Sequence, residues 1–154
     1  MRYWPVFAVV VGCSGGGDDV TLDHGHHHDD SGMTVDCDGA EPFVAGMSAT
    51  TSESGATVAI TAADPTPPDV GDNSWTLAIS DASGPVEGLT VTVTPWMPLH
   101  GHGLTPADYA AADEGGGAYA VAPFDLIMPG LWEFRVRLGD AGADEALFAL
   151  CAEG

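Results

Sequence analysis

Hydrophobic and polar residues alternate along several short stretches of the chain, which is the pattern of β-strands that bury one face. Trp75, Leu77 and Ile79 fall on one face of "SWTLAIS". In "LTVTVTPW" the hydrophobic residues alternate with threonines, which places Val91 and Val93 on the inward face. The stretch "LWEFRVRLG" also alternates, with apolar residues on one face and charged residues on the other. Long helical periodicity is absent, so the pattern predicts an all-β protein.

Turn residues divide the chain into about seven short strands, and this spacing is typical of an immunoglobulin-like β-sandwich. The expected strands cover residues 41–51, 56–65, 74–80, 89–96, 118–126, 131–139 and 144–151. The segment "SESG" is predicted to join the first two strands as a hairpin, and "DASGPVEG" to join the third and fourth as a second hairpin. One helical turn is expected at "PADYAAA". A small closed barrel is the alternative architecture.

The N-terminus resembles a bacterial lipoprotein signal peptide, with one arginine, a short apolar run and then "VVGCSGGG". Residues 1–12 are predicted to be the signal peptide, and Cys13 the lipidated residue that anchors the protein to a membrane. Residues 13–35 are too polar and glycine-rich to bury a core, so we expect a disordered tether. Residues 36–154 then form the β-sandwich domain. The alternative for the N-terminus is a short buried strand followed by a linker.

Four histidines lie on the predicted tether among aspartates: His24, His26, His27 and His28. Neutral imidazole is a ligand for copper, zinc and nickel, and a flexible tract can offer several arrangements to one ion. The tract is therefore a candidate for weak metal binding. A solvated linker that binds metal only incidentally explains the same composition equally well.

The two remaining cysteines, Cys37 and Cys151, lie near the two ends of the predicted domain. An exported protein meets an oxidising compartment, where such a pair forms a disulfide. We therefore predict a Cys37–Cys151 disulfide. The alternative is that one of these cysteines is a thiolate metal ligand.

The charge balance is strongly acidic, with 23 Asp and Glu against 3 Lys and Arg and a formal net charge of -20. A nucleic-acid binder needs a basic surface to neutralise phosphates, so nucleic acid is excluded as a partner. The negative field should instead concentrate cations. The chain also lacks the nucleophile, zinc-protease and phosphate-loop motifs of common enzymes, so we expect no catalytic activity.

The segment "WMPLHGHG" holds the most concentrated set of metal-ligating side chains outside the tether: Met97, His100 and His102. A thioether favours Cu(I), and imidazole suits both copper states and zinc. Met128 in "IMPG", or Met47, could complete the set if the loops at one end of the sandwich meet. Two other interpretations remain open. The histidines could hydrogen-bond loop carbonyls and hold a structural turn, or the segment could contact a protein partner.

Four motifs occur in order along the chain: "GDNSW", "DASGPV", "MPLHGHG" and "MPGLW". In this order they resemble the YtkA-like domain family, which is related to the FixH family, over roughly residues 57–150. The resemblance implies a small immunoglobulin-like sandwich on an exported or membrane-anchored protein, with a copper-related role. FixH-type proteins carry a membrane helix that this chain does not match, so their role in oxidase assembly is not carried over.

Within the resemblance, Met97, His100 and His102 match by position, and Met128 matches through its M-P-G context. The expected function is that of a lipid-anchored protein of the cell envelope, facing the periplasm or the cell surface. It would carry or buffer copper, with zinc as a second possible metal, and could pass the ion to a metal-receiving protein. The alternative is a metal-free structural or protein-interaction module.

Overall fold

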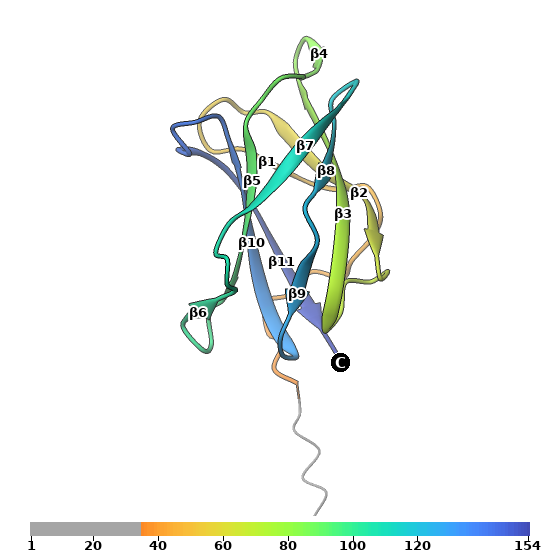
Figure 1. The fold of residues 1–154 in the computed structure, drawn as a ribbon, viewed down its shortest axis with the longest axis vertical. Helices are drawn as coiled ribbons and strands as arrows, with labels where there is room; N and C mark the ends of the chain where they lie inside the picture. Colours follow the sequence, from red (N-terminus) through yellow and green to blue (C-terminus); the bar gives the residue numbers. More distant parts are fainter. Residues whose placement is uncertain (1–34) are drawn as a thin grey trace, which may run out of the picture. The chain divides into compact units, whose positions relative to one another are not determined.

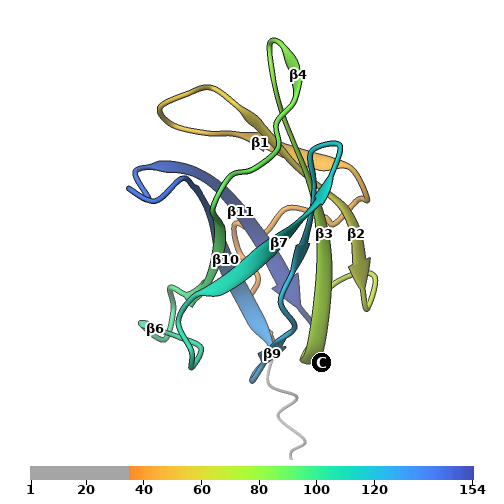
Figure 2. The same ribbon diagram turned by 45° about the horizontal axis from the view of Figure 1, so that its top comes forward.

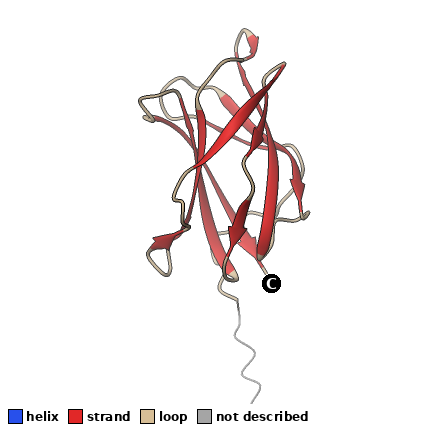
Figure 3. Ribbon diagram, viewed as in Figure 1, coloured by secondary structure: helices blue, strands red, loops and turns tan. Residues whose placement is uncertain are grey.

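The computed structural model describes residues 35–154, and every regular element in this range is a β-strand (Figure 3). The strands are β1 (Met47–Thr50), β2 (Thr57–Asp64), β3 (Gly71–Asp81), β4 (Gly84–Pro85), β5 (Val91–Met97), β6 (His102–Gly103), β7 (Tyr109–Gly115), β8 (Ala118–Val121), β9 (Phe124–Leu126), β10 (Gly130–Leu138) and β11 (Asp144–Ala152). The predicted all-β class is confirmed. No helix in residues 35–154 is long and apolar enough to span a bilayer. The predicted signal peptide, Cys13 and the histidines of residues 24–28 lie outside the described range.

The strands form one hydrogen-bonded path that curls into two layers (Figures 1 and 2). The order along this path is β1-β2-β3-β8-β7-β5-β10-β11. Strand β7 pairs with both β8 and β5, and it therefore carries the ladder from the first layer to the second. The Ser52 amide donates to the Glu145 carbonyl at 3.0 Å, which brings the end of β1 to β11. The fold thus combines the two-layer packing of a sandwich with the nearly continuous ladder of a barrel.

The core lies between the two layers, and the alternating strands fill it as predicted. Trp75, Leu77 and Ile79 on β3 are buried, as are Val91 and Val93 on β5. The apolar face of β10 is buried as well; its members are Trp132, Phe134, Val136 and Leu138. The opposite face of β10 stays at the surface. There Arg135 pairs with Glu133 at 3.3 Å, and Arg137 pairs with Glu145 at 3.2 Å.

Aromatic rings link the two layers across the core. The Trp75 ring on β3 lies 4.4 Å from the Phe134 ring on β10 and 5.2 Å from the Phe124 ring on β9. Tyr109 on β7 lies 5.7 Å from Phe124. Such pairs contribute about 0.5–1.5 kcal/mol each beyond the burial of their area. The cluster therefore fixes how the layer with β3 sits on the layer with β10.

The predicted hairpin between residues 74–80 and 89–96 is wrong. Strand β3 pairs with the short strand β4 through only two positions, Ser80 with Pro85 and Asp81 with Gly84. Pro85 has no N–H to extend the ladder, and the next residues cross to the other layer. There β5 lies between β7 and β10. The turn after β3 was predicted correctly, but the long strand that follows it, β5, belongs to the opposite layer.

Two further local predictions are corrected. The expected helical turn at residues 106–112 is instead a loop followed by β7, because the alanines there pair with β5 and β8. The expected strand at residues 118–126 is split into β8 and β9 around Pro123. Both pieces pair with β3, but their registers on β3 differ by one residue. A proline without an N–H is the natural place for this break.

The predicted disulfide between Cys37 and Cys151 is present. It ties the segment of residues 35–41 to β11, next to a hydrogen bond from the Glu41 amide to the Ala149 carbonyl at 2.8 Å. The Leu131 amide also donates to the Asp36 carbonyl at 3.0 Å. We call residues 35–41 the N-terminal strap, because it crosses the start of β10 without being a strand itself.

The loop between β1 and β2 is tied to β11 through Asp144. The carboxylate of Asp144 accepts hydrogen bonds from the Ser54 hydroxyl at 2.5 Å and from the Glu53 amide at 2.8 Å. Burial is the largest single influence on the pKa of Asp144 and raises it, but hydrogen bonds from Ser54, Glu53 and Thr51 together outweigh burial. They lower the pKa from 3.8 to about 2. Asp144 therefore stays ionised at almost any pH that the fold tolerates.

Removing the disulfide should destabilise the domain strongly. The bond spans 114 residues, and for a loop of that length the chain-entropy model gives a loss of about 4–5 kcal/mol. We expect the Cys37→Ser, Cys151→Ser double variant to unfold at a markedly lower urea concentration than the oxidised protein. The reduced wild type should match the variant. Equal midpoints for the oxidised and reduced protein would contradict the prediction.

Stability should fall as the pH drops from about 4 to about 2. The folded-state pKa of Asp144 is below its unfolded value, so its ionised form stabilises the fold above that value, and protonation removes this contribution. Asp69 acts in the same direction, because the amides of Gly154 and Val70 lower its pKa. Urea midpoints measured across this range should therefore depend less on pH in Asp144→Asn than in the wild type. An unchanged slope would show that the loop does not hold the carboxylate.

Candidate functional site

Met97 and His102 face each other across a short hairpin at one end of the domain. Met97 ends β5 and His102 begins β6, and the two residues are direct partners in the antiparallel ladder. Directly opposed residues carry their side chains on the same face of a sheet. For Met97 this is the core face, since it continues the inward alternation of Val91 and Val93, and only 1% of the residue is exposed. His102 is half-buried beside it.

The turn of the hairpin brings His100 to the same place. The Gly101 amide donates to the Met97 carbonyl at 2.9 Å, and Gly101 adopts a φ of 67° that favours glycine. The rings of His100 and His102 lie 5.8 Å apart between centroids. Imidazole nitrogens bind metals at about 2.0–2.1 Å, so two rings on one ion have centroids at most roughly 6 Å apart. The two histidines are therefore close enough to share an ion.

The fold requires both glycines of "HGHG", but hydrogen bonding does not require the histidines. A Cβ at Gly103 would lie 2.7 Å from the Pro95 carbonyl oxygen, so the hairpin needs glycine there as it does at Gly101. By contrast, no hydrogen bond within residues 35–154 involves His100, and His102 Nδ1 lies 3.2 Å from the carbonyl of its own neighbour, Gly103. The imidazoles thus contribute little to holding the turn.

Trp132 supports this end of the site from β10. Its ring centroid is 6.4 Å from that of His102, in an edge-to-face arrangement. Its Nε1–H donates to the Met128 carbonyl at 3.1 Å and so fixes the turn that precedes β10. Trp132 is fully buried. The sequence identified Trp132 only as a core residue, and the contact with His102 becomes visible once the register of β5 and β10 is known.

The side chain of Met97 reaches past Gly130 at the start of β10. A Cβ at Gly130 would lie 2.8 Å from the Met97 methyl carbon, and Gly130 has a φ of 131°. Gly130 therefore leaves room for the end of the thioether side chain. Met97, Gly130 and His100 all line one shallow pocket of about 160 Å³.

The N-terminal strap supplies part of the wall of this pocket. Val35 and Asp36 line it together with Met97, His100 and Pro129. Sequence reasoning placed residue 35 on the tether and gave Asp36 no role, because the strap reaches the pocket only through its hydrogen bond to Leu131 and the disulfide. The disulfide thus holds a wall of the candidate site as well as the edge of the fold.

The other predicted ligands do not line this pocket. Met128 lies on the turn before β10, is partly buried against the core and is not among the residues that line the pocket. Met47 lies on β1 and also packs against the core. Cys37 and Cys151 are bonded to each other, which removes both as thiolate ligands. Within residues 35–154 no three His, Cys, Asp or Glu side chains gather in a way that could hold a metal. A three-ligand site at this hairpin would therefore have to include the Met97 thioether.

The comparisons with known proteins point to one family. The model of the YtkA-like family matches residues 52–137, which is more than half of the 154 residues. The matched range contains Met97, His100, His102 and Met128, and it leaves out both cysteines of the disulfide. Neither the curated proteins nor the solved structures give a significant match.

The Gly130→Ala variant should disturb the position of Met97 and destabilise the domain by about 1–3 kcal/mol, because it adds a clash to a backbone conformation that alanine rarely adopts. Gly139→Ala is the matched control, since Gly139 has a φ of 77° but open space around its Cβ position. We expect the control to cost less stability in thermal unfolding. Equal losses in the two variants would mean that the Met97 side chain does not occupy this space.

Proposed function

This chain belongs to the YtkA-like family, and we propose that its domain binds copper through Met97, His100 and His102 as a carrier or buffer. The observation that carries the proposal is the convergence of one thioether and two imidazoles at one end of the domain. Met128 stands on the adjoining turn as a further candidate ligand. We propose no catalytic role for the domain.

The donor set suits copper better than other common metals. Thioether sulfur is a soft ligand that favours Cu(I), and imidazole binds both copper states. Zinc accepts the imidazoles, but methionine is not among its usual protein ligands. Calcium and magnesium need oxygen ligands, which the hairpin of β5 and β6 does not supply from its side chains. Copper is therefore the metal that these residues fit best, with zinc second.

The placement of the three ligands suits exchange of the ion. Met97 is buried and lines the pocket together with His100, which is exposed, and the half-buried His102 stands beside the pocket without lining it. A structural metal site surrounds its ion with protein ligands, whereas this one opens to solvent through the side of His100. An ion held here could be reached by an incoming ligand, as transfer to a metal-receiving protein requires.

The charge of the domain supports capture of a cation. Both described arginines are already paired: Arg135 with Glu133, and Arg137 with Glu145 and Asp108. The remaining acidic surface concentrates cations around the protein without selecting among them. Selectivity must therefore come from the Met97 thioether.

The cellular setting is part of the same proposal. Export, lipidation at Cys13 and a place in the cell envelope, facing the periplasm or the cell surface, rest on the N-terminal sequence alone. The disulfide agrees with an oxidising compartment. The histidines His24, His26, His27 and His28 would act as a weak collecting arm for the same metal.

A second candidate function is a metal-free protein-interaction module. The observation in its favour is the exposure of large hydrophobic residues near the same hairpin. Leu99 is 65% exposed, and Ile127, on the loop after β9, is 57% exposed. Exposed apolar side chains beside a turn are also features of an interface.

A competition titration separates the two functions. The chain with His24, His26, His27 and His28 replaced by alanine is titrated with Cu(I), Cu(II) and Zn(II) against chelators of known affinity. In metal sites generally, mutating residues that only hydrogen-bond to the ligands lowers metal affinity 10–100-fold. We therefore expect the Met97→Leu, His100→Gln, His102→Gln variant to lose Cu(I) affinity by roughly a hundred-fold or more.

Met47→Leu is the matched control, because it makes the same methionine change in the other layer of the fold. It should leave Cu(I) binding intact, and Met128→Leu shows whether the fourth predicted ligand takes part. Binding that is weaker than micromolar, or that is unchanged in the triple variant, would rule out the copper function and favour the interaction module.

A further inference from the structure

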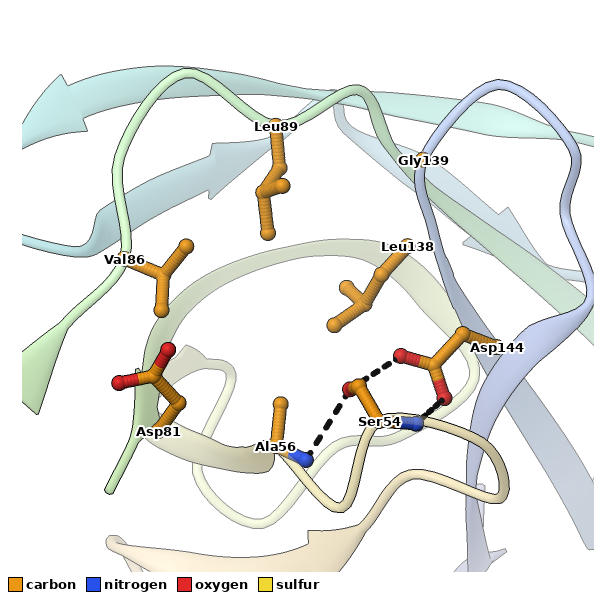
Figure 4. A pocket seen from close by; sticks show the side chains of 8 residues that line it. All are labelled: Ser54, Ala56, Asp81, Val86, Leu89, Leu138, Gly139 and Asp144. Atoms are coloured by element: carbon orange, nitrogen blue, oxygen red, sulfur yellow. Dashed lines mark hydrogen bonds between the residues drawn. The ribbon is translucent and has the colours of Figure 1, made fainter. Parts of the chain in front are cut away.

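A second pocket lies at the end of the domain where β3 and β10 both finish, which is the end opposite β6 in Figure 1. Figure 4 shows this pocket from close by. Its volume is about 270 Å³. The loop after β1, the end of β3, the crossover after β4, the end of β10 and the start of β11 all contribute to its wall. Eight residues line it: Ser54, Ala56, Asp81, Val86, Leu89, Leu138, Gly139 and Asp144.

The interior of this pocket is apolar. Figure 4 shows the side chains of Val86, Leu89, Leu138 and Ala56 directed toward its centre from different sides. Leu138 and Ala56 are buried and belong to the core, and Val86 and Leu89 pack against that core while remaining partly exposed. No side chain of the described residues fills the space between them. An alkyl chain of a few carbons would therefore find hydrophobic surface here.

Two carboxylates flank the apolar centre from opposite sides, Asp81 at the end of β3 and Asp144 at the start of β11 (Figure 4). Asp144 is held in place by Ser54 and by the Glu53 amide, which also keep it ionised. The Ser54 hydroxyl and the amides of Glu53 and Ser54 donate to its two oxygens, and Thr51 lowers its pKa through a further hydrogen bond. Asp144 would therefore attract an ammonium group through its negative charge rather than through a free acceptor site. Asp81 uses Oδ1 to accept from the Ser83 amide at 2.6 Å.

No basic side chain of the described residues lines the pocket, so the two negative charges have no partner from the wall. Arg137, on the neighbouring end of β10, is paired with Glu145 and Asp108 instead. The pocket thus offers two anions separated by a hydrophobic surface. A complementary ligand carries two cations separated by a hydrophobic chain.

We propose that this pocket binds a linear aliphatic diamine, with one ammonium group at Asp81, the other at Asp144 and the carbon chain over Val86, Leu89 and Leu138. A bare divalent cation would gain nothing from the apolar centre and would need more oxygen ligands than the wall provides. A single lysine side chain would supply one ammonium group for two carboxylates. The volume lies below the range of about 300–1,000 Å³ typical of drug-sized ligands, which agrees with a small molecule.

The diamine site does not depend on the copper site. The two pockets lie at opposite ends of β5 and share no lining residue. Loss of metal binding in the hairpin variants would therefore leave diamine binding unaffected, and the reverse also holds. Experiments can therefore contradict the copper proposal without contradicting the diamine proposal, and the reverse.

Amide NMR spectra of the whole chain, titrated with 1,4-diaminobutane and 1,5-diaminopentane, test the site. We expect a dissociation constant on the order of 1 mM at low salt, because exposed ion pairs add little each and binding costs entropy. The shifts should centre on residues 54–56, 81–89 and 138–144. Raising the salt concentration should weaken binding, since salt screens exposed charges.

Asp81→Asn is the decisive variant, because asparagine keeps the oxygen that accepts from Ser83 but loses the charge. It should weaken diamine binding about three- to five-fold, as expected for one exposed ion pair. Asp72→Asn on β3 is the matched control for net charge and should leave the affinity unchanged. Butylamine and Nα-acetyl-lysine amide, with one ammonium group each, should bind more weakly than the diamines.

Three results would overturn the site. Shifts spread over the acidic surface, with equal effects of Asp81→Asn and Asp72→Asn, would show general attraction of cations. Equal affinity for butylamine and 1,4-diaminobutane would show that one carboxylate is not used. Absence of any shift around residues 81–89 at high diamine concentration would show that the pocket binds no amine.

Discussion

The contact between Trp75 and Phe134 across the core is the interaction on which the rest of the structure depends. Trp75 belongs to the layer that contains β3, and Phe134 belongs to the layer that contains β10, with 4.4 Å between their ring centroids. Phe124 and Tyr109 extend the same contact to β9 and β7. Because these rings fill the centre, the two layers keep one spacing and one register. The ends of the strands then meet in fixed positions.

Strand β5 connects the packed core to the candidate metal site. Its inward positions run from Val91 at one end of the core to Met97 at the other, and its ladder with β10 sets Trp132 beside the hairpin of His102. The inward positions in the middle of the strand are therefore apolar, and the thioether of Met97 stands at the end of the strand. Sandwich-like folds place their variable chemistry at such ends, because loops there can change without disturbing the packed rings.

The sequence predicted which residues form strands better than it predicted which strands pair with each other. Period-two alternation identified the buried faces of β3, β5 and β10, and the cysteine count identified the disulfide. The same alternation, continued by two positions past Pro95, places Met97 on the core face, although the predicted strand ended at residue 96 and Met97 was predicted only as a metal ligand. Pairing of β5 with β7 and β10 could not be predicted, because turn residues such as Gly84 and Pro85 indicate a reversal without saying which layer the chain enters next.

The hairpin of "WMPLHGHG" shows how structure separates residues that serve the fold from residues that do not. Gly101 is needed for its positive φ, Gly103 for its close approach to Pro95, and Met97 fills space against Gly130. His100 serves none of these purposes, whereas His102 contacts the Gly103 carbonyl and packs edge-to-face against Trp132. Replacing the His100 imidazole by another polar side chain should therefore cost the fold little stability. The exposed His100 ring, 5.8 Å between centroids from the His102 ring, is therefore the side chain that the fold explains least, and this supports the proposed metal site.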